Sequence, residues 1–211
     1  MTNTVILATG NPGKIREFQA VLKQFDLKPQ SDFAVPEAEE KGLSFLENAL
    51  IKAQNAAKST GFPALADDSG LVVDALQGAP GIYSARYAGV QATDQENLDK
   101  LLAELEDVAE TERSARFVCA LAFCRYPADP IPVIAQATWE GLITREQYGT
   151  SGFGYDPVFY LPDLQCTSAQ LTAQQKNAIS HRGQALAELC RLLPQSTYAQ
   201  RQSLDGQTWS P

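Results

Sequence analysis

One stretch of the sequence, residues 116–126, is apolar at nearly every position and constrains the fold more than any other. In an extended strand, successive side chains point to opposite faces. Both alternating sets are apolar here: Phe117, Cys119, Leu121 and Phe123 on one face, and Val118, Ala120, Ala122 and Cys124 on the other. A strand that is apolar on both faces belongs in the middle of a sheet that is covered on both sides. Residues 131–143 are its expected hairpin partner.

The chain opens with a pattern of strand, turn and helix. Residues 5–8 form a short apolar run, and the next six residues contain two glycines and a proline. Apolar residues then recur at helical spacing, at Ile15, Phe18, Leu22 and Phe25. This order is the usual beginning of an α/β fold.

Further helices are predicted along the chain. Ser44 and Glu47 have the spacing of a capping box, and Gly61 is a suitable end for the helix that they start. Residues 93–106 carry an apolar stripe and are expected to be helical. Thr172, which is spaced from a glutamine like a capping box, starts a last helical stretch.

Taken together, these elements predict an α/β fold with a long mixed β-sheet, flanking helices and two lobes around a central substrate cleft. The 211 residues suffice to bury a substantial core without a disulfide or a metal. We expect residues 1–195 to form a single domain and residues 196–211 to form a polar tail.

The charge of the chain limits its partners. Acidic residues outnumber basic ones by 25 to 17, for a formal net charge of −8. A general nucleic-acid binder usually has the opposite sign, because neutralisation of phosphates dominates its affinity. A small polyanionic ligand remains compatible, provided that cations are concentrated locally or that a metal ion accompanies the ligand.

The cysteines and the N-terminus indicate the compartment. The four cysteines form no CxxC pair, and with a single histidine the chain has little to offer a zinc ion. The N-terminus lacks the pattern of a signal peptide, and no apolar run is long enough to span a bilayer. We therefore expect a cytoplasmic protein with reduced thiols and no membrane partner.

The first candidate site is the turn of residues 9–14, TGNPGK. A glycine-bearing turn at a helix N-terminus can bring backbone N–H groups to a phosphate, and Lys14 adds a full charge. The turn is not a Walker A loop, because two residues rather than four separate its glycines. A purely geometric role for the glycines is the alternative.

Carboxylates form the second candidate site. Glu37, Glu39 and Glu40 precede the predicted second helix, and Asp67–Asp68 lies between the short strands predicted at 64–66 and 71–73. Carboxylates at strand ends can hold magnesium, and one of them can act as a general base toward water. For the glutamates, a solvated loop is the alternative.

Two late segments complete the candidate sites. Residues 149–157 interleave glycines with two aromatic residues, which could stack on a purine or could instead fill the core. In the segment 176–183, Lys176, His181 and Arg182 would not share one face of a straight helix. We therefore predict a break near residue 179, with Ser180 capping a new helix. No GxSxG motif or activated cysteine supports a serine or cysteine hydrolase.

Six segments in this order resemble the inosine/xanthosine triphosphate pyrophosphatase family, whose members remove deaminated purine nucleotides. They are TGNPGK, AEEKGLSFLENA, ADDSGL, GAPGIYSARY, GTSGFGYDPVF and KNAISHRG. The resemblance covers about residues 5–193. It implies a magnesium-dependent hydrolase that converts ITP, dITP and XTP to the monophosphate and pyrophosphate, and it implies a homodimer.

The resemblance also implies roles for individual residues. Asp68 would be the general base and would bind Mg²⁺ together with Glu40, which is preferred to its neighbour Glu39. The residues that would contact the nucleotide are Thr9, Gly10, Asn11, Pro12, Gly13, Lys14, Lys52, Ser69, Phe153, Gly154, Tyr155, Asp156, Lys176, His181 and Arg182. A donor on a backbone N–H or on Arg182 would select the 6-oxo group of hypoxanthine and xanthine over the amine of adenine.

Other functions fit the same residues less well. A related pyrophosphatase acting on modified pyrimidine or other damaged nucleotides would use the same chemistry with a different base pocket. A regulatory module that binds nucleotides without turnover would not need paired carboxylates beside a phosphate site. A structural or interaction protein would leave these loops without a role.

Overall fold

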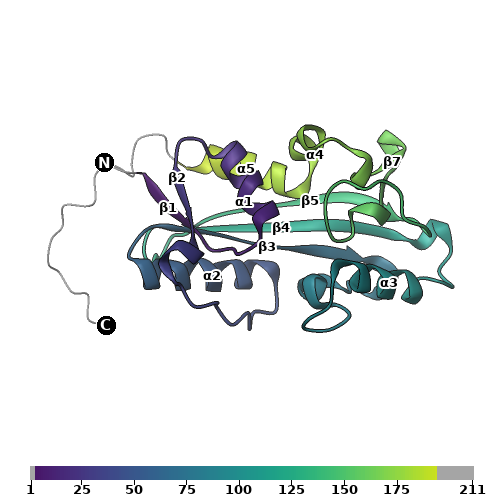
Figure 1. Cartoon of the computed structure of the whole chain (residues 1–211), viewed down its shortest axis with the longest axis horizontal. Helices are drawn as coiled ribbons and strands as arrows, with labels where there is room; N and C mark the ends of the chain where they lie inside the picture. The colour runs from purple at the N-terminus through teal and green to yellow at the C-terminus, as the bar shows by residue number, and fades with distance from the viewer. Residues whose placement is uncertain (1–2, 194–211) are drawn as a thin grey trace, which may run out of the picture.

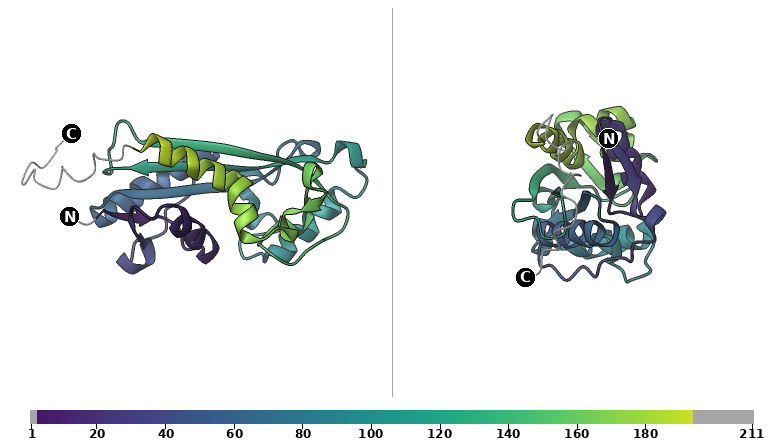
Figure 2. Two further views of the ribbon diagram at one scale, coloured as in Figure 1. Left: turned by 90° about the horizontal axis from the view of Figure 1, so that it is seen from above. Right: turned by 90° about the vertical axis from the view of Figure 1, so that its left-hand side faces the viewer.

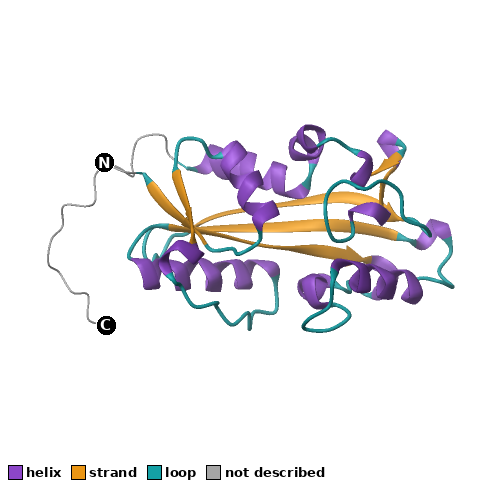
Figure 3. Cartoon of the chain, viewed as in Figure 1, coloured by secondary structure: helices purple, strands orange, loops and turns teal. Residues whose placement is uncertain are grey.

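The computed structural model describes residues 3–193, which form one mixed seven-stranded sheet with helices on both sides (Figures 1 and 3). The strands are β1 (Thr4–Leu7), β2 (Asp26–Pro29), β3 (Ala64–Val73), β4 (Ser114–Cys124), β5 (Val133–Ile143), β6 (Phe159–Leu161) and β7 (Cys166–Thr167). The α-helices are α1 (Pro12–Val21), α2 (Phe45–Thr60), α3 (Asp94–Glu104), α4 (Ala173–Ile179) and α5 (His181–Leu192). The expected α/β class is confirmed.

Short 3-10 helices punctuate the connections. They are η1 (Gln30–Phe33), η2 (Asp74–Leu76), η3 (Gly81–Arg86), η4 (Glu110–Glu112), η5 (Asp156–Val158), η6 (Pro162–Leu164) and η7 (Ser168–Gln170). None of the helices within residues 3–193 is long and apolar enough to cross a membrane. The predicted polar tail, residues 196–211, lies outside the described residues, and the single domain of residues 1–195 stays a prediction.

The sheet has the strand order β2-β1-β3-β4-β5-β6-β7. β1 pairs in parallel with β2 and β3, whereas the remaining pairs are antiparallel. β3, β4 and β5 form a long central ladder that runs through the whole molecule (Figure 1). The predicted hairpin partner of the apolar strand is therefore confirmed as β5.

The two faces of β4 pack against different helices, as its sequence requires. Cys119, Leu121 and Phe123 belong to a core cluster with residues of α1 and α5. Ala120 and Cys124 belong to another cluster, built around the alanines of α2. In Figures 1 and 2, α2 and α5 accordingly lie on opposite sides of the central strands. A third cluster, with α3, fills the other end of the molecule.

Most of the predicted helix ends are observed. The Ser44 hydroxyl caps α2 by accepting the Glu47 N–H, and Gly61 ends this helix at φ 73°. The Glu47 carboxylate accepts the Leu43 N–H instead of completing a capping box on Ser44. The predicted box at Thr172 is complete.

The segment around Asp67 and Asp68 differs from the prediction. The sequence suggested two short strands separated by a turn, whereas β3 runs unbroken from Ala64 to Val73 and pairs with β4 throughout. The adjacent aspartates therefore lie in mid-strand and not at a strand end. Two features explain this. Each aspartate has a cationic partner, and Gly70 allows a close approach of η3, since a Cβ there would lie 2.4 Å from the Ser84 hydroxyl.

Candidate active site

A cleft of about 830 Å³ lies over the middle of β3. Its walls come from the β1–α1 turn, the loop before α2, the segment 82–97, the segment 153–156 and the junction of α4 with α5. All predicted site residues line it except Pro12 and Gly13. Segments that are far apart in the sequence thus meet in one cavity, as the two-lobed prediction requires.

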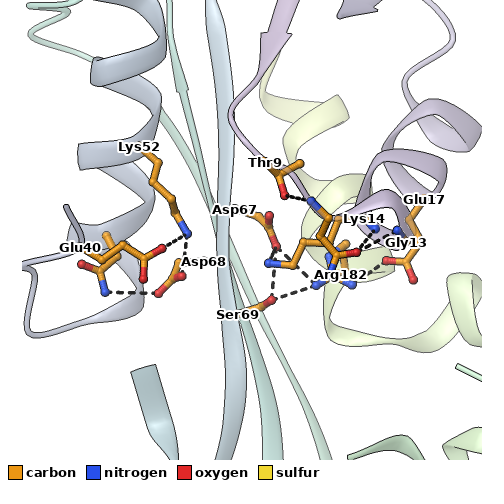
Figure 4. A network of polar contacts seen from close by, with 12 residues as sticks. Thr9, Gly13, Lys14, Glu17, Glu40, Lys52, Asp67, Asp68, Ser69 and Arg182 are labelled. Carbon is orange, nitrogen blue, oxygen red and sulfur yellow. Dashed lines mark hydrogen bonds and ion pairs between the residues drawn. The ribbon is translucent and has the colours of Figure 1, made fainter. Parts of the chain in front are cut away.

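Strand alternation places Asp67 and Asp68 on opposite faces of β3, and it divides the polar network of the cleft into two halves (Figure 4). In Figure 4 the Asp67 side chain lies on the side of the β1–α1 turn and α5, and that of Asp68 lies on the side of α2. Both carboxylates are at most 7% exposed. One strand therefore delivers two buried carboxylates to two different environments.

Asp67 is held between two cations. Its carboxylate lies 2.8 Å from the Lys14 ammonium and 3.4 Å from the Arg182 guanidinium. The same guanidinium contacts Glu17 at 2.6 Å and donates to the Ser69 hydroxyl at 2.8 Å. Burial opposes ionisation of Asp67, but Lys14 and Arg182 more than compensate and hold its pKa far below the usual range. Asp67 is therefore a permanent anion that fixes two cations at the cleft.

Asp68 belongs to a second cluster. Its carboxylate lies 2.7 Å from the Lys52 ammonium, which also lies 2.9 Å from Glu40, and Glu40 contacts Arg86 at 3.3 Å. Burial raises the pKa of Asp68, and the attraction of Lys52, countered by the nearby charge of Glu40, does not reverse this. A carboxylate whose pKa is raised accepts a proton more readily than an ordinary aspartate does, which suits a general base.

In Glu40 and Lys52, the other two members of this cluster, the neighbouring charges outweigh the effect of burial on the pKa. Burial tends to raise the pKa of Glu40, but Lys52 and Arg86 lower it below its ordinary value. Burial tends to lower the pKa of Lys52, but Asp68 and the neighbouring carboxylates raise it above its ordinary value. Both residues are therefore charged at neutral pH.

Asn48 connects this cluster to the loop that carries Glu40, and the sequence analysis missed it. Its side chain is fully buried; its amide donates to Asp68 over 3.5 Å and its carbonyl oxygen accepts the Gly42 N–H at 2.8 Å. The only signal in the sequence is an asparagine next to the alanine face of α2. Arg86 was likewise not predicted, and Asp67 was considered only as a member of the Asp67–Asp68 pair, without a role of its own.

The β1–α1 turn is organised by its own side chains. The Asn11 side chain caps α1 by accepting the N–H groups of Gly13 and Lys14, at 2.8 and 3.2 Å. The Thr9 hydroxyl accepts the Asn11 N–H at 3.2 Å. Thr9, Asn11 and Lys14 line the cleft, whereas Pro12 and Gly13 are not among its lining residues.

The glycine-rich loop 149–157 uses its two aromatic residues differently. Tyr155 is 5% exposed, and its hydroxyl donates to the Ser84 carbonyl oxygen, so this ring belongs to the core. Phe153 remains 38% exposed at the cleft, with the Lys176 ammonium 5.0 Å from its ring centre. One aromatic residue of this loop therefore fills the core, and the other is exposed at the cleft.

Asp156 fixes the shape of the same loop. Its buried carboxylate accepts the Phe153 N–H at 2.8 Å and the Ser168 hydroxyl at 2.7 Å, and it pairs with Lys176. In addition, the Gly154 N–H donates to Asp94, the first residue of α3, at 2.8 Å. The exposed phenylalanine is therefore held in place from both walls of the cleft.

The predicted helix break is confirmed. α4 ends at Ile179, and Ser180 caps α5 by accepting the Gly183 N–H. His181 is then buried at the cleft, where its ring stacks on Phe117 with centres 4.9 Å apart and an interplanar angle of 13°. Burial, reinforced by the charges of Arg182 and Lys176, lowers the pKa of His181 well below its usual value. The imidazole is therefore neutral at pH 7.

Three buried side-chain atoms have no hydrogen-bond partner within residues 3–193. They are Oδ1 of Asp67, Nδ1 of His181 and Nε of Arg182. Buried polar groups are almost always hydrogen-bonded, so each of these atoms requires an explanation. All three residues line the same cleft. This concentration of unsatisfied groups indicates that the cleft binds a polar molecule.

Within residues 3–193 there is no group of three or more histidine, cysteine, aspartate or glutamate residues that could hold a metal. Glu40 and Asp68 are instead a pair of carboxylates that converge on one ammonium group. All four cysteines are free, and burial raises the pKa of Cys119 to about 12, so this thiol is not a nucleophile.

The sequence matches the Ham1 family over residues 5–192. The chain belongs to the Ham1 family. It is 58% identical to the dITP/XTP pyrophosphatase of Shigella flexneri over 184 residues, which are 86% of this chain and 93% of that protein. The resemblance carried by the six sequence segments is therefore confirmed.

Solved structures of Ham1 proteins share the fold. The HAM1 protein of Coxiella burnetii superimposes with a TM-score of 0.85 at 51% identity, covering 91% of this chain and 98% of that one. A nucleoside-triphosphatase / dITP/XTP pyrophosphatase of Mycobacterium abscessus superimposes with a TM-score of 0.72 at 42% identity, covering 90% and 99%. The seven-stranded mixed sheet is thus the fold of the Ham1 family.

Proposed function

We propose that this chain hydrolyses the deaminated purine nucleoside triphosphates ITP, dITP and XTP to the monophosphate and pyrophosphate, and so clears them from the nucleotide pool. Two of the relatives described above, those of Shigella flexneri and Mycobacterium abscessus, are named dITP/XTP pyrophosphatases. The observation that carries the proposal is the cleft itself. It combines a buried carboxylate whose pKa is raised, Asp68, with lysines on both sides of β3 and an exposed aromatic ring, Phe153.

The triphosphate is assigned to the part of the cleft where lysines from both faces of β3 meet. Lys14, Lys52 and three residues of the β1–α1 turn, Thr9, Gly10 and Asn11, line this part, and Ser69 lies beside it. The N–H groups of Gly13 and Lys14 already serve the Asn11 cap. The side chains of Thr9, Asn11 and Lys14 are therefore the groups of this turn that face the phosphates.

The base is assigned to the remaining part of the cleft. Phe153 offers a ring face for stacking, and the segment Gly154–Asp156 supports it. Lys176, His181 and Arg182 complete this wall. The Nε–H of Arg182 lacks a partner within residues 3–193, and it is a donor suited to the 6-oxo group that distinguishes hypoxanthine and xanthine from adenine.

Asp68 is the proposed general base. It takes a proton from water while the water oxygen attacks the α-phosphorus, and the bond from this phosphorus to the bridging oxygen breaks to release pyrophosphate. The positive charges of Lys14 and Lys52 favour the negative charge that develops on the departing group. No covalent intermediate is required, which agrees with the raised pKa of the buried Cys119 thiol.

The residues present also fit magnesium. Mg²⁺ is commonly bound by one or two carboxylates together with phosphate oxygens, and Asp68 and Glu40 are two carboxylates whose oxygens converge on a single cation. When bound there, Mg²⁺ supplies additional positive charge for the phosphate oxygens.

We further assign the protein to the cytoplasm, and we expect it to be a homodimer. Sedimentation analysis checks the dimer.

A product assay tests the function. The protein is incubated with Mg²⁺ and, separately, with ITP, dITP, XTP, GTP and ATP, and the products are separated by anion-exchange chromatography. We expect monophosphate and pyrophosphate from the first three and little turnover of the last two. Release of diphosphate and phosphate would place the attack at another phosphorus and contradict the mechanism. Binding without turnover would indicate a regulatory module, and a preference for pyrimidine nucleotides a different base pocket.

A further inference from the structure

Lys52 occupies an unusual place in the proposed metal site. Its ammonium lies 2.7 Å from Oδ1 of Asp68 and 2.9 Å from Oε1 of Glu40, so it bridges the two carboxylates (Figure 4). Its side chain is only 16% exposed. The position between these two oxygens is the one that a divalent cation bound by both carboxylates would compete for.

The two carboxylates need a cation between them. Each raises the free energy of the other's charged form, and the charge of Glu40 contributes to the raised pKa of Asp68. Arg86 contacts Glu40 from the outside at 3.3 Å, and Lys14 lies with Asp67 on the opposite face of β3. Lys52 alone among these cations contacts both Asp68 and Glu40.

A count of charges shows what a metal ion would change. Asp68 and Glu40 carry two negative charges, and Lys52 and Arg86 carry two positive ones, so the cluster is neutral. A divalent cation that joined it would leave a surplus of two positive charges in a half-buried place. A triphosphate removes this surplus, and the flexible stem of Lys52 allows its ammonium to turn from the carboxylates to the phosphates.

We propose that Lys52 is a built-in competitor of the metal ion, which holds Asp68 and Glu40 together, yields its place to free metal only at high metal concentration, and yields it more readily when a triphosphate binds with the metal. Lys52 thereby weakens the binding of free divalent metal and makes metal binding depend on the nucleotide. This role goes beyond phosphate binding. It rests on the proposed function only in that the metal and the triphosphate belong to the same cleft.

The test measures metal binding in the absence of nucleotide. Mn²⁺ is titrated into the full chain, and free Mn²⁺ is counted from its electron paramagnetic resonance signal. The variant Lys52→Met removes the ammonium and keeps a side chain of similar length. We expect it to bind Mn²⁺ about tenfold more tightly than the unmodified chain, because a unit positive charge within 3 Å of both carboxylates has been removed.

The matched control is Lys41→Met. Lys41 lies on the same loop as Glu40 but pairs with Glu39 at the surface, where its side chain is 70% exposed. We expect its Mn²⁺ affinity to be unchanged. Equal or weaker binding by Lys52→Met would overturn the proposal, and so would equally tight binding by both variants, since that would reflect net charge alone.

A second measurement needs no substitution and covers the case in which Lys52→Met does not fold. The unmodified chain is acetylated with an N-hydroxysuccinimide ester at rising Mg²⁺ concentration, and peptides are quantified by mass spectrometry. Acetylation of Lys52 relative to Lys41 should rise severalfold as Mg²⁺ displaces the ammonium. An unchanged or falling ratio would overturn the proposal. Neither measurement contains a nucleotide, so both are independent of the product assay.

Discussion

Asp67 and Asp68 are consecutive residues of one strand, yet β3 places them in opposite situations. Asp67 faces Lys14 and Arg182, and its pKa lies far below the usual range. Asp68 faces Lys52, and burial raises its pKa. The number of cations on each face and the negative charge of Glu40 beside Asp68, and not the identity of the residue, separate the two pKa values.

This difference indicates how the strand divides its tasks. A carboxylate that stays ionised under all ordinary conditions is a poor proton acceptor, but it fixes the cations around it. A carboxylate whose ionised form is disfavoured accepts a proton more readily. We therefore expect Asp67 to act on stability and on the placement of Lys14 and Arg182, and Asp68 to act on the chemical step.

The largest expected effect is that of Asp68→Asn on turnover. The amide keeps the shape of the side chain but cannot take the proton of the attacking water, so kcat for dITP should fall by about 10²- to 10⁴-fold. Assays of pyrophosphate release at saturating dITP, quenched at fixed times, measure this change in kcat. Retention of more than a tenth of the activity would show that Asp68 does not act in the chemical step, and it would contradict the different roles proposed for Asp67 and Asp68.

Asp67→Asn should instead destabilise the fold. It leaves the buried charges of Lys14 and Arg182 without their shared partner, and loss of one member of a buried ion pair typically costs about 3–5 kcal/mol. Urea unfolding followed by circular dichroism measures the change. Asp26→Asn is the control, because the pair of Asp26 with Lys28 is exposed and should contribute at most about 1 kcal/mol. Similar losses in both variants would contradict the special position of Asp67.

Asn48, which contacts Asp68, tests the Asp68 side of this comparison. Asn48→Ala leaves the Gly42 N–H without its acceptor and should lower the free energy of unfolding by about 1–3 kcal/mol. It should also raise the Mg²⁺ concentration needed for half-maximal activity, because the loop that carries Glu40 loses its tie to α2. The control Asn55→Ala breaks an exposed bond from the same helix to Pro36 and should leave the Mg²⁺ requirement unchanged. Equal Mg²⁺ requirements in both variants would reduce Asn48 to a structural role.

The sequence predicted the parts of the fold that depend on local patterns. The alternation in residues 116–126, the caps at Ser44 and Thr172 and the break before His181 are each set by a few neighbouring residues, and the structure contains all of them. The residues expected in one site also meet in one cleft, apart from Pro12 and Gly13. The periodicity of the sequence alone does not show which residues meet in this cleft, and that prediction came from the motifs and their resemblance to a family.

The parts that were wrong or missing depend on contacts distant in the sequence. Two adjacent aspartates within an apolar segment suggested a turn, because nothing near them in the chain compensates their charge. Their partners, Lys14, Lys52 and Arg182, are each 16 or more residues away from the aspartate that they contact and arrive only with the tertiary fold. Asn48 was missed for the same reason, since its partners lie in β3 and in a loop whose path the sequence does not reveal.

The smallest expected effect belongs to His181, on the wall of the cleft that is proposed to face the base. It is the single histidine of the chain, and in the folded state its pKa is lowered well below 6.5, first by burial and then by Arg182 and Lys176. The unfolded chain therefore takes up a proton near pH 6.5 that the folded chain does not, so stability must fall as the pH falls through this value.

Between pH 7 and pH 5.5 this loss should amount to roughly 1 kcal/mol in the free energy of unfolding. In His181→Gln the loss should disappear, although the variant differs from the unmodified chain in absolute stability. The free energy of unfolding is therefore measured by urea unfolding at several pH values, and its slope against pH, not its absolute value, is compared between the two proteins. The contributions of the carboxylates are the same in both proteins and cancel. Parallel slopes would mean that His181 takes up its proton in the folded state. The imidazole would then be a positively charged donor at mildly acidic pH, and the wall proposed for the base would carry more positive charge than the burial of His181 indicates.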